Sequence, residues 1–306
     1  MTMEGGVIEQ RRERVEHVKK VGYAPKAIKK KRCRNKIQRC VEPKVPRALQ
    51  ELFVACRDVF KGPGSVLAPC DVSKLCKIID DMKPEDVGLS NRLQKIFSAQ
   101  DAAKGHLMED GVKGSPIVTY TTIYKCSKFS LCLFFLPATA VIPLHNHPEM
   151  TVFSKLLLGT MHIKSYDLVD PVRSHDTPPH SQRREGSFMC QCCDEFAARL
   201  ARLVADNDFT APCDTSVLYP TTGGNIHEFT AITTCAVLDV LGPPYSKADG
   251  RDCSHYKEFP FSAFSNGENS VNAEEGECYR WLEEIEVPEN SQMDEIEYLG
   301  PQIDDK

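Results

Sequence analysis

Pro143-Leu144-His145-Asn146-His147-Pro148 places two histidines one residue apart, between two prolines. Side chains alternate between the two faces of a β-strand, so His145 and His147 point to the same side if this stretch is extended. Two imidazoles on one side of a strand can bind the same metal ion. The stretch therefore predicts half of a metal site, carried by a β-strand.

A third ligand is predicted at His227, which follows the glycine-rich turn Gly223-Gly-Asn-Ile and opens another apolar run. A single histidine in a strand is more often an ordinary hydrogen-bonded residue than a ligand. A His-x-His pair with a glycine-rich approach to a third histidine favours a metal site instead. We therefore predict that His145, His147 and His227 bind one ion and that the rest of the chain is their scaffold.

The composition is that of a globular protein. The chain has 306 residues, of which 41% are apolar and 26% charged, enough for one large domain or two modest ones. It has no run of about 18 apolar residues and no apolar signal core at its N-terminus, so we expect neither membrane association nor secretion. Its 14 cysteines are scattered, which indicates reduced thiols in the cytosol or nucleus.

The net charge of −5 hides a strong asymmetry. Residues 1–47 carry 15 Lys/Arg and 5 Asp/Glu, a net charge of +10, and the remaining residues carry −15. We predict a disordered basic tail over residues 1–45, in which Lys29, Lys30, Lys31 and Arg32 form a nuclear import signal, with the protein in nucleus and cytoplasm. A merely solvated tail is the alternative. Direct nucleic-acid binding is not expected, because the body is acidic and no aromatic residues interleave with the basic ones.

The segment from residue 46 to residue 105 is predicted to form a helical layer. Apolar residues recur at helical spacing after Pro46, which suits the first turn of a helix. Gly62-Pro63-Gly64 ends this helix, and Asp71 is expected to cap a second one. We expect the layer to pack on the following domain, since the segment is short for a separate helical domain.

Strand character dominates residues 111–265, and many short strands between Pro/Gly turns predict a sandwich or closed barrel. The predicted strands are Ile117 to Tyr124, Phe129 to Leu136, Val152 to Leu158, Met161 to Tyr166, Ser216 to Tyr219, His227 to Thr233 and Ala236 to Leu241. Residues 170–190 are expected to form a polar surface loop, and Ala197 to Val204 a short helix. Residues 266–306 are expected to be an acidic C-terminal segment, solvated and mobile at its end, with Trp281 and Leu282 as anchors near its start.

Two motifs resemble those of the cupin β-barrel: the strand-borne His-x-His followed by Gly159, and Gly224-x-x-His227. This resemblance implies a mainly β cupin-type double-stranded β-helix, or jelly-roll barrel, over residues 46–265 with its N-terminal helical layer. Many cupins carry a glutamate ligand where this chain has Val152, so the resemblance implies three histidines and no carboxylate. A three-histidine site is typical of the thiol dioxygenases.

Longer motifs are similar to those of the plant cysteine oxidases, relatives of the animal cysteamine dioxygenases, over residues 46 to 262. These motifs are Pro143 to Gly159, Lys164-Ser-Tyr-Asp167, Leu218-Tyr-Pro, Gly223 to His227 and Val237 to Tyr245. The resemblance implies an Fe2+ enzyme that uses O2 to oxidise the N-terminal cysteine of a protein to cysteine sulfinic acid. The implied targets are group VII ethylene-response transcription factors, whose oxidised N-terminus becomes a degradation signal in an oxygen-sensing pathway.

The resemblance also nominates Asp239, Tyr245 and Cys253 as catalytic residues. Asp239 would orient His227 or accept a hydrogen bond from the substrate amine, unless it is a salt-bridged or exposed aspartate. Tyr245 follows a rigid Gly-Pro-Pro turn, from which its hydroxyl would reach substrate or oxygen, unless it is an ordinary rim aromatic. Cys253 is nominated because some thiol dioxygenases cross-link a cysteine to a tyrosine near the iron, although nothing in this sequence shows that bond.

Two other functions stay open. A dioxygenase of free cysteine or cysteamine would use the same chemistry, but residues 117–136 contain lysines and no arginine to clamp a free carboxylate, which favours a peptide. A metal-binding cupin that serves only as a regulatory module would consume no oxygen with thiols. We expect a monomer, since no coiled-coil pattern or unassigned apolar stripe is present.

Other histidines and cysteines give weaker signals. Cys190, Cys192 and Cys193, with the nearby His175 and His180, lack the spaced pairs that are typical of a zinc site. His162 has the sequence context of an ordinary strand residue.

Overall fold

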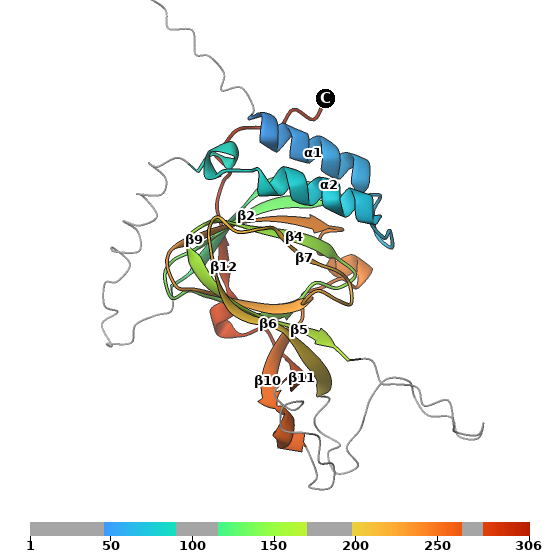
Figure 1. Cartoon of the computed structure of the whole chain (residues 1–306), viewed down its shortest axis with the longest axis vertical. Coiled ribbons are helices and arrows are strands. Elements are labelled where there is room, and N and C mark those ends of the chain that lie inside the picture. Colours follow the sequence, from blue (N-terminus) through green and yellow to red (C-terminus); the bar gives the residue numbers. More distant parts are fainter. Residues whose placement is uncertain (1–45, 90–115, 170–197, 265–277) are drawn as a thin grey trace, which may run out of the picture. The chain divides into compact units, whose positions relative to one another are not determined.

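The computed structural model describes residues 46–89, 116–169, 198–264 and 278–306, and it is mostly β-structure with two helices at the N-terminal side (Figure 1). The predicted basic tail over residues 1–45, with its import cluster, and the predicted loop over residues 170–190 lie outside the described residues. Both described helices are too short to cross a membrane.

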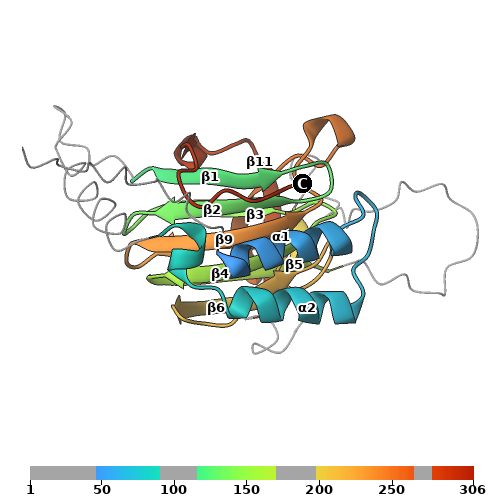
Figure 2. The ribbon, with the colours of Figure 1, turned by 90° about the horizontal axis from the view of Figure 1, so that it is seen from above.

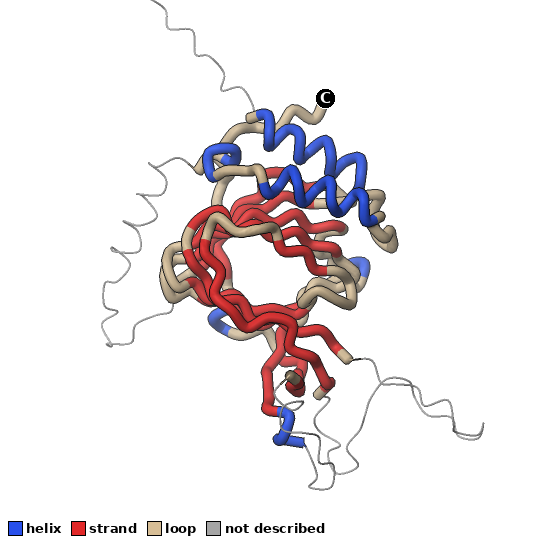
Figure 3. Tube along the Cα trace, in the orientation of Figure 1, coloured by secondary structure: helices blue, strands red, loops and turns tan. Residues whose placement is uncertain are grey.

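Two six-stranded sheets curve around a common centre (Figure 3), which confirms the cupin-type barrel. The first sheet has the order β12 (Met293–Glu295), β1 (Val118–Lys125), β2 (Ser130–Leu136), β9 (Cys235–Gly242), β4 (Thr151–Leu158), β7 (Ser216–Leu218). The second is closed, with β3 paired back to β10, and has the order β10 (His255–Pro260), β11 (Tyr279–Ile285), β6 (Arg199–Thr210), β5 (Thr160–Leu168), β8 (Ile226–Ala231), β3 (Val141–Asn146). All seven predicted strands are present.

Helices α1 (Arg47–Val59) and α2 (Pro69–Asp80) cover the outer face of the first sheet (Figure 2). Phe53 of α1, in the main apolar core, packs edge-to-face on the partly buried Tyr124, with ring centroids 4.7 Å apart. The prediction that Asp71 caps α2 is wrong. Pro69 takes the first helical position, so the helix begins earlier and Asp71 lies in its first turn.

The short helix predicted for Ala197 to Val204 is also wrong, because the residues from Arg199 onward belong to strand β6. Its alanines, leucines and arginines favour a helix locally. In the fold, however, β6 pairs with β5 on one side and β11 on the other, and this tertiary pairing overrides the local preference.

The expected anchor at Leu282 is confirmed, but the end of the acidic C-terminal segment differs from the expected solvated tail. Its described part contributes β11 to the second sheet and β12 to the first, where β12 runs parallel to β1. The chain then reaches α1, where the Gln50 side chain donates to the Asp304 carbonyl at 2.8 Å and accepts from the Asp304 amide at 3.0 Å. Apolar anchors such as Leu282 and Ile303 hold these acidic stretches on the barrel and on the helical layer.

Candidate metal centre

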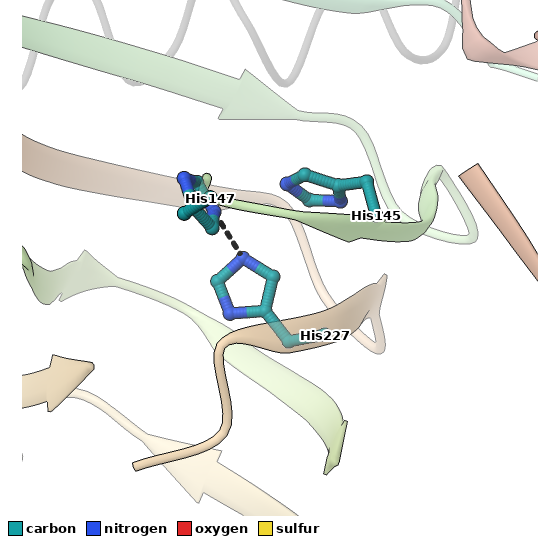
Figure 4. Close-up of side chains that lie close together, drawn as sticks. All are labelled: His145, His147 and His227. Atoms are coloured by element: carbon teal, nitrogen blue, oxygen red, sulfur yellow. Dashed lines mark hydrogen bonds between the residues drawn. The ribbon is translucent and has the colours of Figure 1, made fainter. Parts of the chain in front are cut away.

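Three histidines from two neighbouring strands converge inside the barrel (Figure 4). His145 lies on β3 directly opposite His227 on β8, and His147 follows just beyond the end of β3. One ring nitrogen from each residue lies within 4.8 Å of the other two. The Nε2 atoms of His147 and His227 are 3.0 Å apart. The structure thus brings together the three ligands predicted from spacing.

Hydrogen bonds orient two of these rings. The Nδ1 of His145 lies 2.8 Å from the carbonyl oxygen of Pro143, so its N–H donates there and Nε2 keeps a free lone pair. The Nδ1 of His147 lies 2.8 Å from the hydroxyl of Tyr245, which itself donates to the Asn146 carbonyl at 2.7 Å. A protonated Nδ1 in His147 satisfies this chain and again leaves Nε2 free, as metal ligation requires.

The three imidazoles are neutral at physiological pH. Burial lowers the pKa of His145 to about 4 and the pKa values of His147 and His227 well below their ordinary value. Neutral imidazole is the form that binds metals. A buried set of three converging neutral imidazoles therefore fits a divalent transition-metal ion.

The glycine-rich turn before His227 is required by close packing. Gly224 has a φ of +83°, and a Cβ there would lie 2.6 Å from the hydroxyl oxygen of Ser165. The carboxylate of Asp167 accepts hydrogen bonds from the backbone amides of Gly223, Gly224 and Asn225 at 3.0, 2.8 and 3.2 Å. This turn is thereby fixed against β5, and it sets the start of β8.

Asn225 joins the two halves of the site. Its side-chain oxygen accepts from the amide of His147 at 3.1 Å, and its side-chain nitrogen donates to the His147 carbonyl at 2.9 Å. Sequence reasoning gave no role to Asn225 or Asp167. Both stand within the quoted motifs, but their contacts depend on how distant strands meet.

All three nominated catalytic residues line the same cavity as the histidines, a space of about 460 Å³. Asp239 on β9 is 5% exposed, so it is not a surface aspartate, and its Oδ1 has no hydrogen-bond partner among the described residues. Burial raises its pKa from 3.8 to about 7. A buried carboxyl with a free oxygen is available to a ligand that enters this cavity.

Tyr245 and Cys253 lie next to each other in the cavity wall. Burial raises the pKa of Tyr245 well above its ordinary value and that of the Cys253 thiol to about 11, so both are protonated at neutral pH. Since the Tyr245 hydroxyl contacts a ring nitrogen of His147, this residue is more than a rim aromatic. In this structure it positions a predicted ligand.

His255 is a further histidine near the site that the sequence did not reveal. It lies on β10 opposite His145, with ring centroids 6.4 Å apart. Its Nδ1 is buried, with no partner within the part of the chain that the structure describes. No motif surrounds it, and only the pairing of β10 with β3 brings it here.

The weaker signals do not add to the site. Cys190, Cys192 and Cys193, with His175 and His180, lie outside the described residues. His162 is on β5, where its ring nitrogens contact the carboxylates of Asp206 and Asp208 at 2.8 and 2.7 Å. Across residues 46–89, 116–169, 198–264 and 278–306, the three cavity histidines are the one cluster suited to a metal.

Comparisons with known proteins agree with this geometry. The profile of the PCO_ADO family matches residues 78–303. Plant cysteine oxidase 2 of Arabidopsis thaliana is 46% identical over 88% of this chain and 88% of its own length. Plant cysteine oxidase 1 of the same plant is 43% identical over 84% and 81%. The 2-aminoethanethiol dioxygenase of Mus musculus is 35% identical over 57% of this chain and 68% of its own.

Proposed function

The chain belongs to the PCO_ADO family and is a thiol dioxygenase, and on this premise we propose that it oxidises the N-terminal cysteine of proteins with Fe2+ as its metal. The thiol gains both atoms of O2 and becomes a sulfinic acid, R–SH + O2 → R–SO2H. The observation that carries the proposal is the set of three buried, neutral imidazoles in a cavity that opens to ligand.

The donor set supports iron. Three neutral imidazoles leave the full charge of a divalent ion uncompensated, unlike the two-histidine, one-carboxylate set of many iron oxygenases. Ferrous iron bound there supplies a cation that favours the thiolate and a redox centre for dioxygen. The chain's own part is to hold the rings of His145 and His147, through the Pro143 carbonyl, Tyr245 and Asn225, in the tautomers and positions described above.

Asp239 is suited to the substrate amine. The α-ammonium group of an N-terminal cysteine would lie beside the free Oδ1 of Asp239 and stabilise its charged form, offsetting the burial that now raises its pKa. We assign Tyr245 the role of orienting His147. Cys253 lies beside the Tyr245 hydroxyl, and we assign it to the same side of the cavity that holds the metal site.

The cavity favours a peptide over a free amino acid. Its volume of about 460 Å³ lies in the range, about 300–1,000 Å³, that suits ligands larger than cysteine. Among the described residues that line it there is a lysine, Lys125, but no arginine that would clamp a free carboxylate. A peptide has no carboxylate next to its N-terminal cysteine and needs no such clamp.

The identity of the protein substrates, the oligomeric state and the localisation are further parts of the proposal. We infer that the protein substrates include group VII ethylene-response transcription factors in an oxygen-sensing degradation pathway. We also infer a monomer that enters the nucleus through Lys29 to Arg32. Light scattering checks the oligomeric state, and exclusion of the intact protein from nuclei would contradict the import signal.

Oxygen consumption with three thiols separates the alternatives. The iron-loaded protein is given a peptide with a free N-terminal cysteine, free cysteine or cysteamine at equal concentration. We expect the peptide to have the highest kcat/KM. A higher kcat/KM with either small thiol would move the enzyme to the small-thiol class, and no consumption with any thiol would leave a metal-binding regulatory module.

A further inference from the structure

A second cavity lies inside the barrel, on the side of β5, β6 and β7. Its volume is about 260 Å³. The apolar side chains of its wall include Leu156, Met161, Val204, Val217, Phe229 and Val237. The cavity that holds the nominated catalytic residues is a different space, and it lies toward β1, β2 and β12.

The two cavities share part of their walls. His227 and Phe229 line both, and their ring centroids are 4.4 Å apart. A small molecule in the second cavity therefore lies against His227, a predicted metal ligand, without passing through the first. The second cavity borders this ligand from another direction.

The inner wall of the second cavity suits an apolar guest. Leu156, Met161, Phe229 and Val237 are each at most 4% exposed. Ser154, Ser165 and His227 are the polar side chains at depth, and no charged group other than Asp214, which is exposed, lines the space. Apolar cavities of this kind take up small apolar molecules such as xenon more readily than water.

The outer end of the cavity lies where β6 and the start of β7 meet. Val204 on β6 lines the cavity and is 44% exposed, and Asp214 and Ser216 are exposed on the other side. Solvent and dissolved gas can therefore approach this end independently of β1 and β12. At about 260 Å³ against about 460 Å³, the space is also the smaller of the two.

We propose that this second cavity is the route by which dioxygen reaches the metal centre, separate from the mouth that admits the thiol. The inference rests on the proposed function. A peptide that fills the larger cavity blocks that approach to the centre, so a gas that binds after the peptide needs another path. Dioxygen is small and apolar, which matches the inner wall.

Val204→Trp tests the route, since the indole would obstruct the outer end from an exposed position where it need not disturb the core. We expect kcat/KM for O2 to fall at least about threefold, while KM for the peptide and kcat at saturating O2 stay unchanged. Asn207→Trp is the matched control, because Asn207 is also exposed on β6 but does not line the cavity. Ala205→Leu, at another lining position, is the second variant if Val204→Trp does not fold.

Xenon gives a readout that needs no metal and no turnover. We expect 129Xe NMR or diffraction under xenon pressure to place xenon against Phe229 and Met161 in the unsubstituted protein and in Asn207→Trp, but much less in Val204→Trp. An empty cavity, or an unchanged kcat/KM for O2 in both lining variants, would overturn the route. Absence of thiol oxidation in the unsubstituted protein, with xenon bound, would instead count against the proposed function.

Discussion

Asn225 shows how the site depends on a residue that touches no metal. Its side chain makes two hydrogen bonds to the backbone of His147 and a third, at 2.7 Å, to the carbonyl of Tyr219. It is 7% exposed, so water does not replace these bonds if they are lost. The position of His147 relative to His227 therefore depends on one amide side chain.

Replacing Asn225 with alanine is expected to weaken metal binding about 10- to 100-fold, as loss of a residue that supports a ligand commonly does. It is also expected to lower the free energy of unfolding by about 1–3 kcal/mol, because buried backbone groups lose their partners. Metal titration and thermal unfolding measure the two effects. Asn207→Ala, on the exposed face of β6, is the control, and equal affinities in the two variants would contradict the role of Asn225.

Asp239 gives a pH-dependent prediction for the metal-free protein. Its pKa is about 7 in the folded state and 3.8 ordinarily, so the folded protein binds its proton more tightly than the unfolded chain. The stabilisation that comes from this tighter proton binding is fully present below about pH 4 and is lost as the pH rises through about 7. Asparagine cannot ionise, so Asp239→Asn should escape this loss.

We therefore expect the stability advantage of Asp239→Asn over the unsubstituted protein to grow by about 1–3 kcal/mol between pH 5 and pH 8.5. Denaturant unfolding of both chelator-treated proteins across this range measures the difference. Parallel stability curves would show that Asp239 is ionised without penalty. Glu286→Gln, which changes an exposed carboxylate just after β11, controls for net charge.

At the residue scale, spacing predicted the three histidines because both strands that carry them have a local signature. The roles of Asn225, Asp167 and His255 were not predictable in this way. Each depends on which residues meet across strands that are distant in the sequence, such as the pairing of His255 with His145. Local sequence carries no record of that register.

At the scale of elements, Lys155 connects the helical layer with the barrel. It lies on β4, is 4% exposed, and donates to the Cys213 carbonyl at 2.5 Å, with the Asp80 carboxylate of α2 3.6 Å away. Asp80 in turn accepts hydrogen bonds from the amide and hydroxyl of Thr215. One lysine thus holds α2, β4 and the approach to β7 together.

Lys155→Ala is expected to destabilise the protein by about 2–3 kcal/mol, since it leaves the partly buried Cys213 carbonyl unpaired and removes a cation from Asp80, which is itself partly exposed. Lys74→Ala, an exposed lysine of α2, should cost less than about 0.5 kcal/mol. Denaturant unfolding of both variants measures this. A loss of similar size in the two would mean that Lys155 contributes nothing specific.

The elements that were predictable are those with local patterns. Runs of β-branched and aromatic residues marked β1, β2, β4 and β9, and apolar periodicity marked α1. The first half of strand β6 has the sequence of a helix, because its alternation is masked by alanine, leucine and arginine, which all favour helices. Strands β10 to β12 were missed because they are short or acidic and form only by pairing with strands from elsewhere.

At the scale of the whole molecule, the C-terminal segment completes both sheets. Strand β11 pairs with β6 and β10, and β12 places Met293 and Glu295 in the wall of the metal cavity. The sequence alone indicated an acidic segment with anchors at Trp281 and Leu282 and a solvated end. The cupin barrel itself was predictable from its two histidine motifs, whereas the use of the C-terminal segment as cavity wall was not.

Mass spectrometry with 18O-labelled dioxygen tests the central claim most directly. A short peptide with a free N-terminal cysteine is incubated with the iron-loaded protein, and His227→Ala serves as the variant that lacks one ligand. We predict a gain of two labelled oxygen atoms on the cysteine, absent with His227→Ala. Labelled oxygen on no thiol, in a protein shown to bind iron, would contradict the account.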